Sequence, residues 1–189
     1  MSEEITQDSL TNLIEDAKYL QDEAEALRYV IDSVPVTQTP PEDRSILEKL
    51  LLLDHLQVNY YRPVFERFES HPRKHVKAKN YQNFCQEFTT DNLDEIDVQK
   101  SLNSLAKHRA ALINIFRQIP LFDWEQLLYK DNQEISLYEF ALDLVRKDRL
   151  ILKEIADQVL VFQQDQNAKR EMEKNLPRED QSSSGNDKN

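Results

Sequence analysis

Glycine is almost missing from this chain, since it occurs once in 189 residues, at Gly185. β-Sandwiches, barrels and doubly wound sheets need many tight turns, and glycine is the residue that most often makes them. The rest of the chain is rich in Leu, Glu, Lys, Gln and Asp. This composition predicts an all-α protein, and the length fits one domain of ordinary size.

Cysteine and long apolar segments are also scarce. The one cysteine, Cys85, excludes an intrachain disulfide and fits a reducing compartment. No apolar run approaches the ~20 residues that span a membrane. The acidic start, MSEEITQDSL, lacks the apolar segment of a secretory signal. We therefore expect a cytoplasmic protein that does not enter the membrane.

Basic residues are outnumbered, with 24 Lys and Arg against 35 Asp and Glu, for a formal net charge of −11. Binding to the phosphates of nucleic acids needs a basic face. The charge balance thus argues against a nucleic-acid partner. The sequence also has no G-x-S-x-G, no phosphate-binding glycine loop and no C-x-x-C motif.

Four segments carry apolar residues at steps of three and four, which is typical of one helical face. These segments are 9–34, 41–69, 95–118 and 136–163. They predict a four-helix bundle over residues 1–163, with a long connection, 70–96, between the second and third helices. Pro63 should kink the second helix or end its regular part. The polar segment 164–189 is expected to be a frayed helix end followed by a disordered tail.

Two helix starts are marked by local signals. Thr39, followed by Pro40 and Pro41, is typical of a helix with proline in its first turn. Ser136 and Glu139 form the S-x-x-E pattern of a capping box, in which each side chain bonds the other residue's backbone N–H. The second and fourth helices are therefore expected to begin near these positions.

Three charged residues lie where the apolar faces of these helices predict core. Asp148 is near the centre of the stripe on the last helix, and Arg109 is central in the stripe on the third. Arg28 is near the edge of the apolar face of the first helix. A carboxylate is too costly to bury alone but tolerable with a guanidinium partner. We expect Asp148 to pair with Arg109, and next with Arg28, as a structural ion pair rather than a catalytic acid or base.

The last two helices resemble a known family. DNQEISLYEFALDLVRKDRLILKEIADQV resembles the last helix of the DinB-like (DinB/YfiT) superfamily, and LAKHRAALINIFRQIPLFDWEQ resembles its third helix with the Asp-Trp that follows. DRSILEKLLLLDHLQVNYYR resembles the second helix less closely, and the resemblance covers about residues 10–160. It implies a four-helix bundle, in agreement with the helix prediction.

The resemblance also implies a metal site that this chain departs from. Active members bind a divalent metal through one histidine on the second helix and two, four residues apart, on the last. Here the matching positions are Leu52, Lys147 and Ile151. His55, one turn from Leu52, is an alternative ligand, but its helical position is turned about 130° from the apolar stripe, towards solvent. We expect no bound metal and no cofactor.

A bundle that keeps the fold and loses the metal is the interpretation we favour. It predicts a non-enzymatic module that binds a small molecule or another protein, and a homodimer, as the resemblance implies. One alternative is a metal-dependent thiol S-transferase or hydrolase of the same superfamily, with a displaced site. Another is an adaptor whose long acidic helices dock a partner protein.

Overall fold

The computed structural model describes residues 4–70 and 76–175. The regular elements in chain order are α1 (Gln7–Leu27), η1 (Ile31–Ser33), α2 (Ile46–Leu56), the π-helical η2 (Gln57–Tyr61), α3 (Arg62–Ser70), α4 (Tyr81–Glu87), η3 (Leu93–Glu95), α5 (Val98–Gln118), η4 (Leu121–Glu125), β1 (Leu127–Lys130), β2 (Gln133–Ser136) and α6 (Leu137–Asn175). Among these described residues no helix is both long and apolar enough to cross a membrane.

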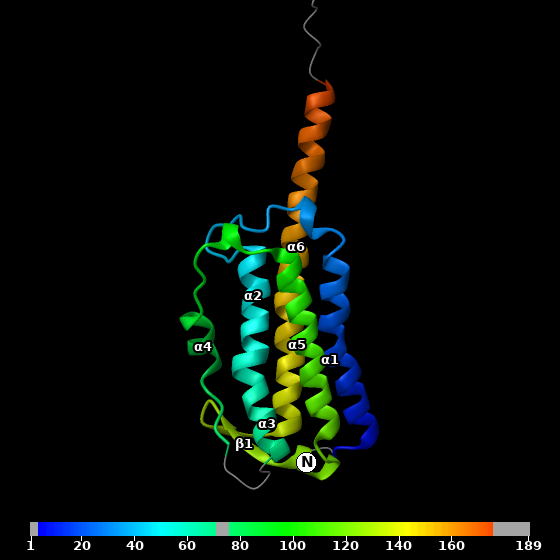
Figure 1. The fold of residues 1–189 in the computed structure, drawn as a ribbon, viewed down its shortest axis with the longest axis vertical. Coiled ribbons are helices and arrows are strands. Elements are labelled where there is room, and N and C mark those ends of the chain that lie inside the picture. Colours follow the sequence, from blue (N-terminus) through cyan, green and yellow to red (C-terminus); the bar gives the residue numbers. More distant parts are fainter. Residues whose placement is uncertain (1–3, 71–75, 176–189) are drawn as a thin grey trace, which may run out of the picture.

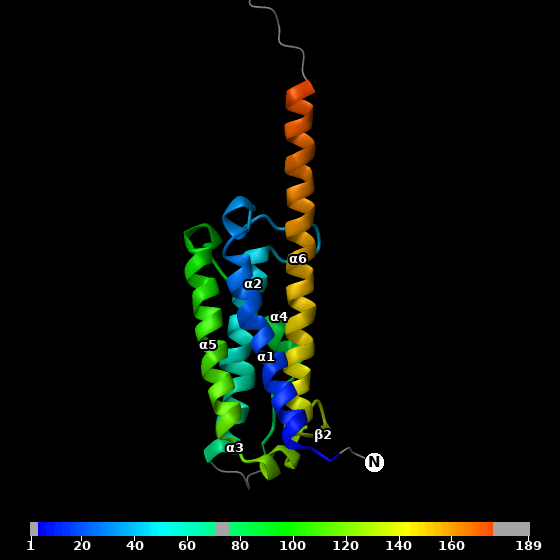
Figure 2. The ribbon, with the colours of Figure 1, turned by 90° about the vertical axis from the view of Figure 1, so that its right-hand side faces the viewer.

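Four long helical stretches form the bundle, namely α1, α2 with α3, α5, and α6 (Figure 1). The stretch from α2 to α3 and the helix α5 run in the same direction, opposite to α1 and α6 (Figures 1 and 2). Both α1 and α2 pack against α5 and against α6, which places α5 and α6 at opposite corners. The connection that carries α4 returns along the outside, as two parallel neighbours require. The prediction of an all-α four-helix bundle with a long connection between its second and third helices is confirmed.

The second bundle helix begins later than predicted. Its cap is Ser45, whose N–H donates to Glu48 Oε2 (2.7 Å) while Glu48 N–H donates to Ser45 Oγ (3.3 Å). This capping box starts α2 at Ile46, not at 41. The residues between Thr39 and Ser45 form turns, and Glu42 has a left-handed φ of 58°. The prediction of a helix start at the prolines was wrong, because the chain begins the helix at the Ser45–Glu48 capping box instead.

The interruption expected at Pro63 takes the form of the π-helical segment η2. Arg62 N–H donates to Gln57 O, five residues back, so the chain takes up one extra residue per turn here. Pro63 has no N–H and its ring would crowd the carbonyl four residues earlier in a regular helix. The wider turn removes that conflict, so α3 continues from α2.

Two other boundaries differ from the sequence prediction. α1 ends at Leu27 instead of near 34, and a short 3₁₀ turn follows at 31–33. α6 runs to Asn175, past the expected end at 163, and its last part stands clear of the bundle (Figures 1 and 2). The remainder of the predicted tail, 176–189, lies outside the described residues.

A short hairpin, which the sequence prediction missed, precedes α6. β1 and β2 pair antiparallel around Asp131 and Asn132, both of which have positive φ. Two left-handed residues are the mark of the tight turn that suits twisted strands. The hairpin delivers the chain to the predicted capping box, where Ser136 N–H donates to Glu139 Oε2 (2.8 Å). The predicted start of the last helix is confirmed.

Candidate functional site

A buried ion pair joins the two helices at opposite corners of the bundle. Arg109 Nη2 of α5 lies 2.8 Å from Asp148 Oδ2 of α6, and the two residues are 0% and 6% exposed. Within the described residues this nitrogen has no well-aligned hydrogen-bond acceptor, so the contact is electrostatic. Burial raises the pKa of Asp148, while the Arg109 charge acts in the opposite direction. Arg28 takes no part: α1 ends before it, and its exposed Nε donates to Gln99 Oε1.

The π-helical segment extends this pair into a network. Arg109 Nε donates to Gln57 Oε1 (3.1 Å), and its Nη1 donates to the backbone oxygen of Ala17 on α1 (3.2 Å). Gln57 Nε2 in turn donates to Leu105 O and to Asp54 Oδ1, both at 2.9 Å. Every helix of the bundle therefore contributes to one polar network. The central groups of the network, Arg109, Gln57 and Asp148, are all buried.

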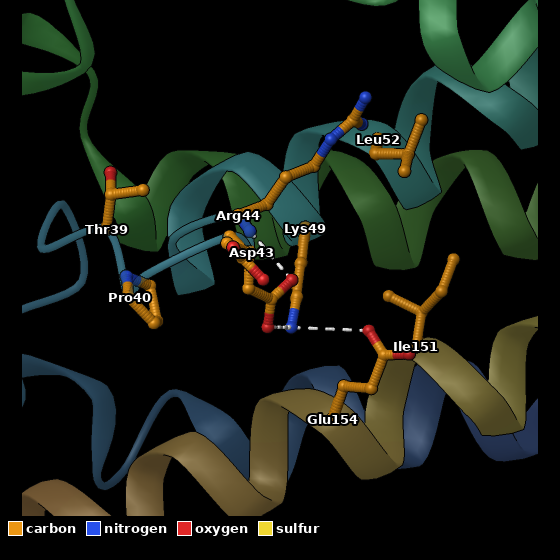
Figure 3. Close-up of a pocket in the computed structure, with 9 residues that line it drawn as sticks. Thr39, Pro40, Asp43, Arg44, Lys49, Leu52, Ile151 and Glu154 are labelled. Atoms are coloured by element: carbon orange, nitrogen blue, oxygen red, sulfur yellow. Dashed lines mark hydrogen bonds and ion pairs between the residues drawn. The ribbon is translucent and has the colours of Figure 1, made fainter.

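An open pocket lies between the loop that precedes α2 and the middle of α6 (Figure 3). Its volume is about 440 Å³. The lining combines aliphatic and charged side chains: Thr39, Pro40, Glu42, Asp43, Arg44, Lys49, Leu52, Ile151 and Glu154. Leu52 from α2 and Ile151 from α6 face each other across it (Figure 3).

Lys49 is the buried cation of this pocket. It is 3% exposed, yet its Nζ lies 2.7 Å from Asp43 Oδ2 and 3.2 Å from Glu154 Oε2 (Figure 3). Partial burial would raise the pKa of Asp43, but hydrogen bonds from Lys49, from the Arg44 backbone N–H and from Gln158 outweigh it and lower that pKa. The ammonium thus links the loop, α2 and α6.

A second pocket, of about 490 Å³, continues from the first along α6 and shares Pro40, Asp43, Lys49 and Glu154 with it. Its further lining residues are Gln38, Pro41, Asp157, Gln158, Val161, Phe162 and Asp165. The two pockets together are called the α2–α6 groove below. The lining residues that α6 contributes run from Ile151 to Asp165, which is about four turns of that helix.

Comparison with known proteins identifies the fold. A solved structure, YfiT from Bacillus subtilis, superposes with a TM-score of 0.66 at 13% sequence identity, covering 84% of this chain and 90% of YfiT. It is described as a probable metal-dependent hydrolase with an unusual four-helix bundle topology. This chain has the four-helix-bundle fold of YfiT. At the level of sequence, no protein-family model and no curated protein matches it.

The three positions that the resemblance assigns to metal ligands in the DinB-like fold do not fit a metal. Leu52 and Ile151 offer aliphatic carbon only, and both line the α2–α6 groove. The third, Lys147, places its Nζ 4.6 Å from the ring centroid of Tyr81 on α4. Within the described residues no group of three or more His, Cys, Asp or Glu side chains is arranged to hold a metal ion.

His55 does not project into solvent as its helical position predicts. Its ring is half-buried and stacks on Phe84, with centroids 5.0 Å apart and planes 22° apart, and it also contacts Phe88 at 5.0 Å. Its Nδ1 lies 3.1 Å from Asn59 Nδ2. Burial, and then the nearby Lys79 charge, lower the pKa of His55 against an opposing effect of Asp54. The imidazole is thus part of an aromatic contact, away from the groove's lining.

The short helix α4 contacts both His55 and Lys147. Phe84 and Tyr81 of α4 cover His55 of α2 and Lys147 of α6, respectively. Arg44 holds α4 in place, because its Nη2 donates to Cys85 O at 2.7 Å and to Phe88 O at 3.4 Å. α4 therefore fills one part of the space between α2 and α6 and leaves the α2–α6 groove open beside it.

Sequence reasoning missed Lys49, Asp43 and Glu154. A signal for Lys49 was present, because it falls within the apolar stripe of its helix between Ile46 and Leu53. The rule that selected Asp148, a charge on an inward face, selects Lys49 equally. Asp43 carried no such signal, because its place depends on the turns that precede α2.

Proposed function

We propose that this chain is a DinB-like bundle that binds a small molecule in the α2–α6 groove without using a metal. The observation that carries the proposal is the Lys49 ammonium, buried between Asp43 and Glu154 beside Leu52 and Ile151. The chain supplies its own cation near the positions that hold a metal ion in active members of the fold.

Electrostatics supports this proposal. The carboxylates of Asp43 and Glu154 are committed to Lys49, so a metal ion at the groove would have to compete with a covalently attached cation. Two cations a few ångströms apart repel by several kcal/mol at an effective dielectric constant of about 20. Leu52 and Ile151 provide no ligand atoms that would offset such a repulsion.

The size and lining of the groove support a small-molecule ligand. Ligand sites are concave, mostly apolar and roughly 300–1,000 Å³ in volume, with a few polar groups that set orientation. Each part of the groove falls in this range, at about 440 and 490 Å³. Pro40, Leu52, Ile151 and Phe162 supply apolar wall.

A role in protein interaction is the second candidate. The end of α6 extends past the other helices (Figures 1 and 2) and exposes Leu160, Val161 and Met172, which are 52%, 54% and 70% accessible. Pairing of two copies stays a prediction, for which this segment offers apolar surface. A partner that requires α6 beyond the bundle, and that binds equally well when the groove is filled, would favour this function over the first.

The test is to fill the groove and measure binding of a neutral apolar probe, 4-phenylbutanol, by NMR titration. Ile151→Trp, or Thr39→Trp at the mouth, should abolish the shifts of the groove residues. Leu150→Trp is the matched control, because Leu150 is the neighbouring, 57% exposed residue of α6 outside the lining. Equal loss in the control, or no shifts at the groove in the unmodified protein, would overturn the proposal.

A further inference from the structure

We infer that the ligand of the α2–α6 groove is an organic cation, an amine attached to an apolar body. The inference rests on the proposed function and adds the charge class of the ligand. It begins with the lining, in which carboxylates outnumber cations. The carboxylates are Glu42, Asp43, Glu154, Asp157 and Asp165, and the cations are Arg44 and Lys49.

The cation that lines both pockets, Lys49, is not available to receive an anionic ligand. The Lys49 ammonium is held by Asp43 and Glu154. The guanidinium of Arg44 is directed to the backbone oxygens of Cys85 and Phe88 and lies over the Phe88 ring, with 5.5 Å from its central carbon to the ring centroid. Arg44 Nη1 has no hydrogen-bond partner in the described part of the chain, but Arg44 lines only the first pocket. A carboxylate or phosphate in the second pocket would thus meet a cation that is already paired.

Several carboxylates of the groove, in contrast, form no ion pair within the described residues. Among residues 4–70 and 76–175, no Lys or Arg forms an ion pair with Glu42, Asp157 or Asp165. Asp157 and Asp165 are eight residues apart on α6, and both line the second pocket. The groove therefore presents an uncompensated negative charge, which attracts cations.

A hydrogen-bond acceptor at the groove wall points to the same class of ligand. Gln158 donates its amide N–H groups to Asp43 Oδ2 and Arg44 O, both at 3.0 Å. Its Oε1 is then a buried acceptor without a hydrogen-bond partner in the part of the chain that the structure describes. A donor is the complement that this wall lacks, and an ammonium group supplies donors together with positive charge.

The apolar lining distinguishes an amine with an apolar body from a simple polyamine. Pro40, Pro41, Val161 and the half-buried Phe162 lie in the same pocket as Asp157 and Asp165. Burial of apolar ligand surface against them adds affinity that salt does not screen, whereas attraction between exposed charges is weakened beyond a Debye length of about 8 Å at physiological salt. Both parts of the ligand therefore have a surface to meet.

The experiment compares probes that share one apolar body, namely 4-phenylbutylamine, 4-phenylbutanol and 4-phenylbutanoate, with spermidine as a cation that lacks it. NMR titrations are run on the full chain near neutral pH at constant ionic strength. The amine should bind about tenfold more tightly than the carboxylate, with the alcohol between them, and spermidine should bind more weakly than the amine at physiological salt. Equal binding of amine, alcohol and carboxylate would overturn the charge class and leave the proposed function standing. Failure of all the phenylbutyl probes would overturn both.

Variants identify the responsible carboxylates. Asp157→Asn and Asp165→Asn should each weaken amine binding by about two- to fivefold, as expected for one exposed charge, and leave alcohol binding unchanged. Glu125→Gln is the control, because Glu125 is an exposed carboxylate in η4 that lines neither pocket of the groove. Loss of amine affinity in the control as large as in the two groove variants, or no loss in either groove variant, would overturn the inference.

Discussion

Replacement of Asp148 by alanine should destabilise the bundle strongly. The substitution leaves the guanidinium of Arg109 buried at 0% exposure without its counter-charge. Arginine does not lose its proton in proteins, so the stranded charge cannot be neutralised. Breaking a buried ion pair by removal of one partner costs roughly 3–5 kcal/mol. We expect the free energy of unfolding to fall by that amount.

The reverse substitution, Arg109→Met, should behave differently with pH. It leaves Gln57 Oε1 without its Arg109 donor, at about 1–3 kcal/mol for an unsatisfied buried group, removes the extra hydrogen bond to Ala17 O, and strands Asp148. Asp148, however, can take up a proton. Its folded-state pKa is already raised by burial, and the variant also loses the opposing effect of Arg109. A raised folded pKa favours the protonated native state, so the deficit of Arg109→Met should shrink as the pH falls towards the ordinary aspartate pKa of about 3.9.

A double-mutant cycle separates the pair from its surroundings. Asp148→Leu combined with Arg109→Met should recover much of the loss, because an apolar pair of similar volume needs no counter-charge. The coupling energy should be roughly 2–3 kcal/mol. Arg149 and Asp16 form the matched control: they join the same α6 helix to α1 at 2.6 Å but are 50% and 47% exposed, so their coupling should stay below about 1 kcal/mol.

The assay is equilibrium unfolding in urea, monitored by circular dichroism of the helices. Variants are compared where the slope of the free energy of unfolding against urea concentration is the same. Coupling near zero for Asp148 and Arg109, or a coupling no larger than that of the surface pair, would refute the reasoning. So would a deficit of Arg109→Met that does not change with pH.

Three further predictions concern the groove, the imidazole and the chain end. Lys49→Ala should lower stability by about 1–2 kcal/mol, because it leaves the half-exposed carboxylates of Asp43 and Glu154 facing each other. Lys49→Met keeps the apolar stem of the side chain, so it should lower stability less in the same urea assay. Burial lowers the pKa of His55, so its contribution to stability is fully present above the ordinary histidine pKa of about 6.5 and is lost as the pH falls below that value. The loss of stability on acidification should therefore be smaller in His55→Phe. A pH profile of stability that is the same in the variant and the unmodified protein would contradict this. Deletion of 170–189 should change stability by less than about 0.5 kcal/mol, since residues 170–174 are exposed, and a broadened unfolding transition would count against it.

The parts of the molecule that sequence could predict are those in which pattern and packing agree. The apolar stripes predicted four helices, and a charge on an inward stripe predicted that Asp148 and Arg109 meet across the core. Both inferences depend only on helical periodicity and on the cost of a lone buried charge. The same rule, applied to the second helix, would have found Lys49.

The parts that it did not predict depend on competition or on distant segments. Arg28 fell outside the core because α1 ends at Leu27, and the stripe alone does not show where a helix stops. Two start signals competed for α2, and the Ser45 capping box prevailed over the prolines. The side of His55 that periodicity assigns to solvent is covered by α4, a segment some thirty residues further along the chain.

The hairpin before α6 was missed for a different reason. Its turn is Asp131-Asn132, whereas Asn-Gly and Asp-Gly are the strong sequence signals for two left-handed residues. In a chain with a single glycine, asparagine and aspartate have to adopt these conformations instead. Scarcity of glycine predicted the fold class correctly and at the same time removed the usual marker of a tight turn.

The most direct test of a groove that functions without metal is a titration of tag-free, chelator-treated protein with Zn²⁺ and Ni²⁺, read as the melting temperature. An ion that binds only the native state must raise stability by mass action. Because Lys49 already pairs with Asp43 and Glu154, and because Leu52 and Ile151 offer no ligand atoms, we expect no shift with either ion. A saturable upward shift that His55→Ala abolishes would contradict the account.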